Sequence, residues 1–250
     1  MQHHEMHITV TQAHTDSLGR LKASAILGFA QDAAEAHCQT LGLDWNTLQG
    51  KGLFWAILRY RLEITRLPRL GEALRLETWP LPTTRSAFPR ATAAYDQAGN
   101  LLFRVLGLWA LVDTQTRAMV LPGKSQIALE GLCRGNELPA PTSLPPLREG
   151  AVCLRHVTQG DTDRNGHMNN AAYLGWLDQL LSQEFRKRHT LTECVICYLS
   201  EATLGQEIAL TYQLFQGSEL LVDGHRTEQK DHGEKTRVFA ARMRFSPVVL

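Results

Sequence analysis

Two stretches of this sequence follow one pattern: DSLGRLKASAILGFAQDAA at residues 16–34 and DRNGHMNNAAYLGWLDQLL at residues 163–181. An Asp and two Gly fall at the same positions in both, and an aromatic residue follows the second Gly. The shared pattern predicts an Asp-x-x-Gly turn that leads into an amphipathic helix. The chain therefore contains an internal repeat, and this repeat decides the fold.

Both turns are followed by apolar residues at helical spacing, which predicts a helix with one buried face. Each stripe also encloses a glycine, Gly28 or Gly175. Glycine lowers helix propensity, so we expect these two to permit close packing against a sheet. The stripes are Ile26, Phe29, Ala30, Ala33, Ala34 and His37 in the first copy, and Tyr173, Trp176, Leu177, Leu180, Leu181 and Phe185 in the second.

Strand-like segments follow each helix. Residues 207–215 alternate apolar and polar side chains, which is typical of a half-buried strand. A sheet must wrap the helix to bury its stripe. The predicted fold class is therefore α+β, with two tandem hotdog folds, each an antiparallel sheet around a central helix. The expected strands are 54–64, 72–81, 91–96 and 101–113, then 193–199, 207–215, 219–226 and 236–245.

Prolines concentrate between the two copies. Five of the ten lie from Pro122 to Pro146, among several glycines, which indicates an extended linker. We expect an N-terminal hotdog at residues 1–125, a linker at 126–150 and a C-terminal hotdog at 151–250.

Composition excludes several classes of function. A net charge of +1 gives no reason to expect a nucleic acid partner. No apolar run reaches the length of a membrane span, and the N-terminus lacks a signal-peptide pattern. We therefore expect a cytoplasmic protein that does not contact a membrane.

The cysteines and the N-terminal histidines do not predict a metal site. Cys194 and Cys197 form a CxxC, but it lies in an apolar strand-like run and has no second pair. His3, His4 and His7 are better explained by a mobile terminus than by metal binding. We expect neither a metal nor a cofactor.

Polar residues crowd the second turn only: Asp163, Asn165, His167, Asn169 and Asn170. Capping needs one of them, with Asn169 or Asn170 suitable as the N-cap. The first copy has Leu18, Arg20 and Lys22 where the second has Asn165, His167 and Asn169. The cluster therefore predicts a functional site at the helix start, where N–H groups stabilise an oxygen that gains negative charge in acyl transfer. With neither a GxSxG elbow nor a Cys beside the turn, water is the expected nucleophile.

The motif D-x-N-x-H-x-N-N at residues 163–170, followed by Y-x-G-W, resembles the acyl-acyl carrier protein thioesterases, double-hotdog enzymes that release free fatty acids. The W-x(5)-R spacing from Trp79 to Arg85 and the G…W-x-L-x-D pattern at 107–113 also resemble that family.

This resemblance implies that Asp163, Asn165 and His167 form a catalytic turn and that Glu201 is a further catalytic residue. Plant members carry a Cys after this Glu, whereas this chain has Ala202, which argues against a thiol nucleophile. Which carboxylate is the general base stays open.

The resemblance also implies a fatty acyl thioester carried by acyl carrier protein as substrate and partner. Asn169 and Asn170 are then expected to bind substrate, and the degenerate first copy to supply the acyl pocket. The candidate pocket residues are Ile26, Ala30, Ala33 and Trp55. Acyl carrier proteins are acidic, so a basic rim is expected, with Arg85, Arg90, Arg186, Lys187 and Arg188 as candidates.

Three alternatives remain open: an acyl-CoA thioesterase, a hotdog hydratase and a non-catalytic sensor of acyl thioesters. The sequence leaves the acyl chain length undetermined, and it is compatible with a monomer or a homodimer.

Overall fold

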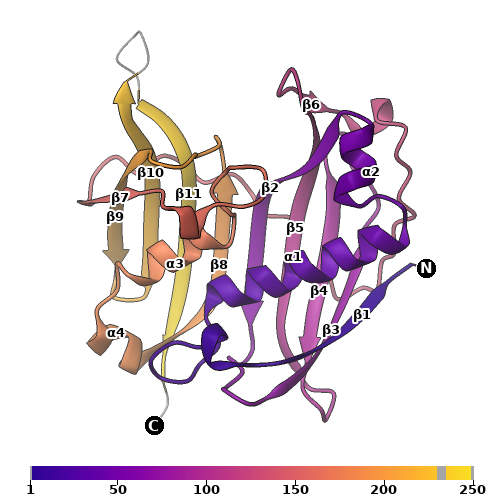
Figure 1. The fold of residues 1–250 in the computed structure, drawn as a ribbon. Coiled ribbons are helices and arrows are strands. Elements are labelled where there is room, and N and C mark those ends of the chain that lie inside the picture. Colours follow the sequence, from indigo (N-terminus) through magenta and orange to yellow (C-terminus); the bar gives the residue numbers. More distant parts are fainter. Residues whose placement is uncertain (1, 230–234, 249–250) are drawn as a thin grey trace. The chain divides into compact units, whose positions relative to one another are not determined.

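Two units, Met1–Pro141 and Thr142–Leu250, make up the computed structural model, which describes residues 2–229 and 235–248. Each unit contains one antiparallel sheet and its own helices (Figure 1). Within the described residues, no helix combines the length and the apolar character needed to cross a membrane.

In the first unit, the long helix α1 lies across one face of the sheet (Figure 1). The strands follow the order β1-β3-β4-β5-β2, all paired antiparallel, with the short strand β6 on β5. The elements are β1 (His4–Thr9), α1 (Ala23–Thr40), α2 (Trp45–Gly50), β2 (Leu53–Ile64), β3 (Ala73–Pro80), β4 (Phe88–Tyr95), β5 (Leu101–Asp113) and β6 (Met119–Val120), with 3-10 turns at Gln12–His14 and Pro122–Lys124.

The second unit repeats this plan with shorter helices. Its strands follow the order β8-β11-β10-β9-β7, again all antiparallel. The predicted turn, helix and antiparallel strands are therefore present in both units, and a further strand, β1 or β7, precedes each turn. The elements are β7 (Ala151–His156), α3 (Ala172–Asp178), α4 (Gln183–Arg188), β8 (His189–Tyr198), β9 (Glu207–Phe215), β10 (Glu219–Gln229) and β11 (Lys235–Pro247), with a 3-10 turn at Gln159–Asp161.

The helix of the second unit is shorter than its apolar stripe predicts. The stripe extends to Phe185, but α3 ends at Asp178 and α4 begins at Gln183. Ser182 explains the break, because its hydroxyl accepts a hydrogen bond from the Phe185 N–H at 3.1 Å and caps a new helix. By contrast, all six stripe residues of α1 are buried, as predicted.

The two helical glycines do not serve close packing, so that prediction is wrong. A Cβ atom built on Gly28 or Gly175 meets no atom within 4 Å outside the glycine's own neighbourhood. Glycine is required instead in the sheets. A Cβ on Gly107 would lie 2.6 Å from the Tyr60 ring, and one on Gly224 would lie 2.2 Å from the Phe239 ring.

The N-terminus is a strand and not a mobile segment. His4 and His7 lie on β1, which pairs with β3 along its whole length. The His4 ring stacks on His37 with centroids 6.0 Å apart. Among the described residues, no group of three or more His, Cys, Asp or Glu side chains is arranged to hold a metal ion.

The Pro-rich segment packs on both sheets, so it is not a free linker. In the first unit, Leu138 is buried against Trp79, and Ile127 against Phe88. In the second unit, the Leu147 N–H donates to the buried Asp223 carboxylate at 2.7 Å. The chain divides after Pro141, inside the segment predicted as the linker.

Candidate active site

The second turn, residues 163–168, is held together by the side chain of Asp163. Its Oδ1 accepts hydrogen bonds from the backbone N–H groups of Asn165 and His167, at 2.8 and 3.3 Å. The Asp163 N–H donates to the His167 carbonyl at 2.8 Å. Gly166 has a φ of +76°, in the left-handed region that favours glycine. The Asp-x-x-Gly sequence therefore fixes the backbone that carries His167.

The first turn, residues 16–21, makes the same bonds with different side chains. Asp16 Oδ1 accepts from the N–H groups of Leu18 and Arg20 at 2.9 and 3.0 Å, and Gly19 has a φ of +69°. The Arg20 guanidinium then folds back onto Asp16 Oδ2, with Nε at 3.1 Å and Nη2 at 3.0 Å. The same backbone turn therefore forms without an Asn or a His.

Two backbone pairings bring Glu201 beside His167. His167 pairs with Thr203 in an isolated antiparallel bridge, and the Met168 N–H donates to the Ala202 carbonyl at 2.7 Å. His167 Nε2 lies 3.5 Å from Glu201 Oε2, with the two side chains 20% and 47% exposed. The pair is therefore accessible at the surface, although the imidazole is largely enclosed.

The first unit has no carboxylate at the corresponding position. Its Leu21 N–H donates to the Pro68 carbonyl at 2.8 Å, which is the counterpart of the Met168–Ala202 bond. This pairing places Leu67 where the second unit has Glu201.

The three asparagines of the predicted site have different environments. Asn165 is exposed at the tip of the turn, whereas Asn169 and Asn170 are half-buried. Asn169 Oδ1 accepts from the Ala171 N–H at 2.8 Å, and the Asn170 carbonyl accepts from the Tyr198 hydroxyl at 2.7 Å. The prediction that Asn169 or Asn170 is the N-cap is wrong, because the cap position is Ala171. Asn169 instead secures the residues just before the helix.

Three polar side chains near the His167–Glu201 pair were not predicted from the sequence as part of the site. Tyr198, at the end of β8, and Tyr173, on α3, have their rings 5.5 Å apart, edge to face. Burial raises the pKa of the Tyr173 hydroxyl, so it stays a neutral phenol. Arg226 on β10 donates from Nη2 to the Glu201 backbone carbonyl. The sequence could have identified Arg226, because it follows the buried residues of β10 at alternate positions and so shares their inward-facing side.

The predicted acyl-pocket residues are part of the first unit's core. Ile26, Ala30 and Ala33 are buried on α1. Trp55 is half-buried, and its Nε1 donates to the Leu43 carbonyl at 3.3 Å.

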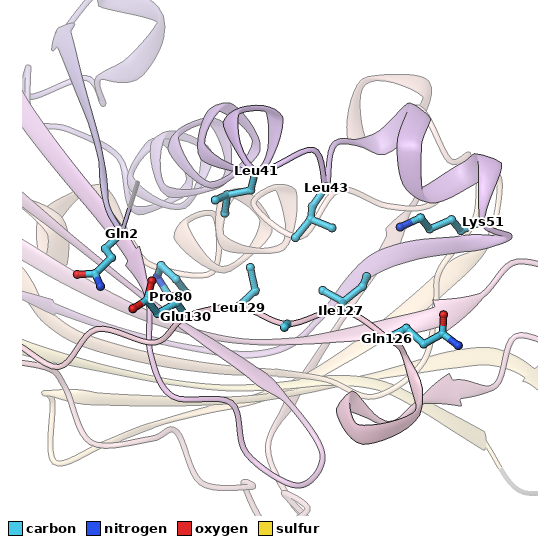
Figure 2. A pocket seen from close by; sticks show the side chains of 10 residues that line it. Gln2, Leu41, Leu43, Lys51, Pro80, Gln126, Ile127, Leu129 and Glu130 are labelled. Atoms are coloured by element: carbon cyan, nitrogen blue, oxygen red, sulfur yellow. The ribbon is translucent and has the colours of Figure 1, made fainter.

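The first unit also contains a cavity of about 350 Å³ near the end of α1, and the four predicted residues are not among its lining. Leu41 and Leu43 lie on one side of it, facing Ile127 and Leu129 on the other (Figure 2). Sequence reasoning missed this cavity because half of its wall comes from the segment predicted as the linker.

One of the five predicted carrier-binding residues is misplaced. Arg90 is 7% exposed, and its Nη1 lies 3.0 Å from His37 Nδ1 in the core of the first unit. A carrier protein cannot reach this guanidinium, so that prediction is wrong. Arg85, Lys187 and Arg188 are exposed and Arg186 is half-buried.

The CxxC cysteines are buried on β8 and are free thiols. Their spacing of three places them on opposite faces of a strand. Burial raises the pKa of the Cys194 thiol, and the Cys197 thiol donates to the Thr142 carbonyl at 3.5 Å. A buried thiol with a raised pKa is a poor nucleophile.

Two family descriptions match this chain. Residues 1–122 match the acyl-ACP thioesterase N-terminal domain, and residues 147–245 match the C-terminal domain. A chloroplastic palmitoyl-acyl carrier protein thioesterase of Gossypium hirsutum is 22% identical over 191 residues, which cover 70% of this chain and 46% of that protein. The chain spans about half the length of the curated relatives it matches.

Solved structures share the fold over nearly the whole chain. An acyl-ACP thioesterase from Bacteroides thetaiotaomicron superposes with a TM-score of 0.85 at 20% identity, covering 98% of both chains. The 12:0-ACP thioesterase from Umbellularia californica gives a TM-score of 0.83 at 17% identity, covering 99% of this chain and 98% of that one. The predicted α+β fold with tandem hotdog domains is therefore confirmed, and the chain belongs to the acyl-ACP thioesterase family.

Proposed function

We propose that this chain hydrolyses the thioester of acyl-acyl carrier protein and releases a free fatty acid and the holo carrier protein. The observation that carries the proposal is the His167–Glu201 pair, whose side chains lie 3.5 Å apart. The first unit has Arg20 and Leu67 at the corresponding positions. Family membership supports the substrate class. Relatives at 21–22% identity are named for palmitoyl, oleoyl or dodecanoyl substrates, so similarity at this level does not select a chain length.

In the proposed mechanism, the Glu201 carboxylate takes a proton from water while the water oxygen attacks the thioester carbonyl carbon. The side chains of His167 and Asn165 stabilise the carbonyl oxygen as it gains negative charge. The Ala171 and Ala172 N–H groups at the start of α3 already donate to Asn169, so they are not assigned this role. The C–S bond then breaks, and the leaving sulfur takes the proton from Glu201. A thiolate leaves readily because a thiol pKa is only about 8.5.

Glu201 is a better candidate than Asp163 for the general base. The Asp163 carboxylate already accepts the two N–H groups that hold the turn, as Asp16 does in the first unit. We therefore assign Asp163 to the geometry of the turn and Glu201 to the water. Ala202 beside Glu201 supports water as the nucleophile.

The remaining predicted roles are kept as proposals. Asn169 and Asn170 shape the substrate side of the turn, and apolar residues of the first unit hold the acyl chain. We also propose basic contacts for the acidic carrier protein, because positive side chains attract a partner of opposite charge. The proposed residues are Arg85, Arg186, Lys187 and Arg188.

The test is thiol release from acyl-carrier-protein and acyl-CoA substrates over a range of chain lengths. We expect release with carrier-protein substrates and at least a hundredfold lower turnover in Glu201→Gln. The matched control is Glu207→Gln, because Glu207 also pairs with a histidine, His156, with Oε2 and Nε2 3.0 Å apart. The control should stay within twofold of wild type.

Other outcomes point to other functions. Release from acyl-CoA alone would indicate an acyl-CoA thioesterase. Hydration of an enoyl thioester without thiol release would indicate a hydratase, and tight binding without turnover a sensor. Wild-type turnover in Glu201→Gln would end the assignment of the base.

A further inference from the structure

Arg226 occupies an unusual position for a charged residue. Along β10, Leu220, Val222 and Gly224 are buried, and Arg226 follows two residues later in the same phase. Side chains two apart on a strand share a face. This face looks into the core, because the space beside Gly224 is filled by the Phe239 ring. The guanidinium therefore extends from the interior of the second unit.

The contacts of Arg226 lead to Glu201. Nη2 donates to the Glu201 backbone carbonyl, which joins β10 to the segment after β8. Its Nε is buried and has no acceptor among the described residues. A buried, unsatisfied donor costs free energy, so its presence calls for a compensating role.

Tyr173 lies close to both groups. Burial raises the pKa of the Tyr173 hydroxyl and has the largest effect on it, while the Arg226 guanidinium lowers this pKa and the Glu201 carboxylate raises it. Because electrostatic influence in a protein falls with distance, the phenol, the guanidinium and the carboxylate share one small region.

The first unit supplies an internal comparison. Its β3–β4 pairing corresponds to β9–β10, with Ala94 opposite Leu76 as Gly224 is opposite Leu210. The position of Arg226 is therefore taken by Asp96, one residue beyond the last paired residue of β4. The unit with Leu67 in place of Glu201 also lacks the arginine, so the guanidinium accompanies the carboxylate and is not required by the sheet.

We propose that Arg226 is a positioning residue that holds the Glu201 peptide and so directs the Glu201 carboxylate toward His167. The inference rests on the proposed function. Arg226 takes no part in bond making. It restrains the backbone of a residue that is exposed at the surface and has no regular secondary structure around it.

Turnover measurements on Arg226 variants test this role. Arg226→Gln should lower kcat about ten- to hundredfold, the range for loss of a charge-assisted hydrogen bond, with KM within twofold. Arg226→Lys keeps a charged donor and should recover at least a third of the loss on a logarithmic scale. Millimolar methylguanidinium should raise the kcat of Arg226→Ala at least fivefold. Arg244→Gln, which removes an exposed arginine of β11, is the matched control and should stay within twofold of wild type.

A double variant separates positioning from simple destabilisation. Because Arg226 acts through Glu201, Glu201→Gln with Arg226→Gln should be no slower than Glu201→Gln alone, within about threefold. Multiplicative losses would overturn the proposal, as would near wild-type kcat in Arg226→Gln. Equal losses in the Gln and Lys variants without methylguanidinium rescue would also overturn it.

The two proposals fail differently. Loss of turnover in Glu201→Gln but not in Arg226→Gln contradicts only the role of Arg226. A wild-type protein that releases no thiol, or an unaffected Glu201→Gln, contradicts the proposed function and the role of Arg226 with it.

Discussion

The two turns at residues 16–21 and 163–168 have the same backbone conformation but carry side chains of different chemistry. In each, an aspartate accepts two N–H groups and a left-handed glycine closes the turn. The first turn neutralises its aspartate with Arg20, whereas the second presents His167 to Glu201. The comparison separates the residues that fix the backbone of the turn from the residues whose side chains can carry function.

The buried Arg90 gives a second contrast between corresponding positions of the two units. Arg90 pairs with Pro80 on β3 as Leu220 pairs with Leu214 on β9, so one strand position is charged in the first unit and apolar in the second. Desolvation lowers the pKa of Arg90, although its hydrogen-bond partners offset part of the cost. A guanidinium buried against His37 of α1 is therefore present at this position only in the first unit.

Replacing the aspartate of each turn should give the largest difference. Asp163→Ala removes two backbone hydrogen bonds beneath His167 and should lower turnover at least about a hundredfold, because the imidazole loses its support. Asp16→Ala should leave turnover within threefold. Both changes should destabilise the protein by about 1–2 kcal/mol, measured by urea unfolding. Equal turnover losses in the two variants would remove the distinction between the turns.

Tyr198 offers a smaller test of the polar network. Tyr198→Phe removes the hydroxyl that donates to the Asn170 carbonyl and keeps the ring against Tyr173. A neutral hydrogen bond contributes about 0.5–1.5 kcal/mol, so kcat should fall about three- to tenfold, with KM little changed. The counterpart, Ile64, pairs with Phe103 as Tyr198 pairs with Phe239, and Ile64→Val should leave kcat unaltered. A full loss of turnover in Tyr198→Phe would mean that the hydroxyl contacts the substrate.

The glycines give the smallest effect. Gly28→Ala and Gly175→Ala should each stabilise the protein by about 0.5–1 kcal/mol, because the new methyl group meets no neighbour and alanine favours the helix. Gly224→Ala should destabilise it instead, because the methyl group would overlap the Phe239 ring. Thermal unfolding measures all three. A fall in Tm for Gly28→Ala would restore the close-packing role predicted from the sequence.

Periodicity and the repeat predicted four strands of each sheet, but not the edge strands β1 and β7 or the short strand β6. Strands β5 and β9 have the predicted bounds. The residues of β9 alternate apolar and polar side chains, whereas β5 is a mostly apolar run with polar turn residues on both sides. The helix break at residues 179–182 was not predictable from the apolar stripe, because a single hydroxyl, that of Ser182, decides it. The packing of the Pro-rich segment on the sheets also left no periodic signal.

The candidate site was predictable to the extent that its residues are local or share a motif. The repeat identified His167 as a difference between the two turns, and the resemblance supplied Glu201, which the structure brings to 3.5 Å from it. Arg226 reaches the site only through strand pairing, and Arg90 is buried by the same pairing. Exposure and long-range contacts depend on the fold. The sequence therefore wrongly predicted Arg90 to be exposed, and it did not predict that Arg226 reaches the site.

The central claim is that the turn at residues 163–168 still folds when it carries the side chains of the first turn, but no longer supports thioester hydrolysis. The direct measurement is thiol release from acyl-carrier-protein substrates by the triple variant Asn165→Leu, His167→Arg and Glu201→Leu, with its thermal unfolding recorded alongside. We predict release at the uncatalysed rate and a Tm within about 3 °C of wild type, because the new arginine can pair with Asp163 as Arg20 pairs with Asp16. Persistent thiol release, or loss of the folded state, would contradict the claim.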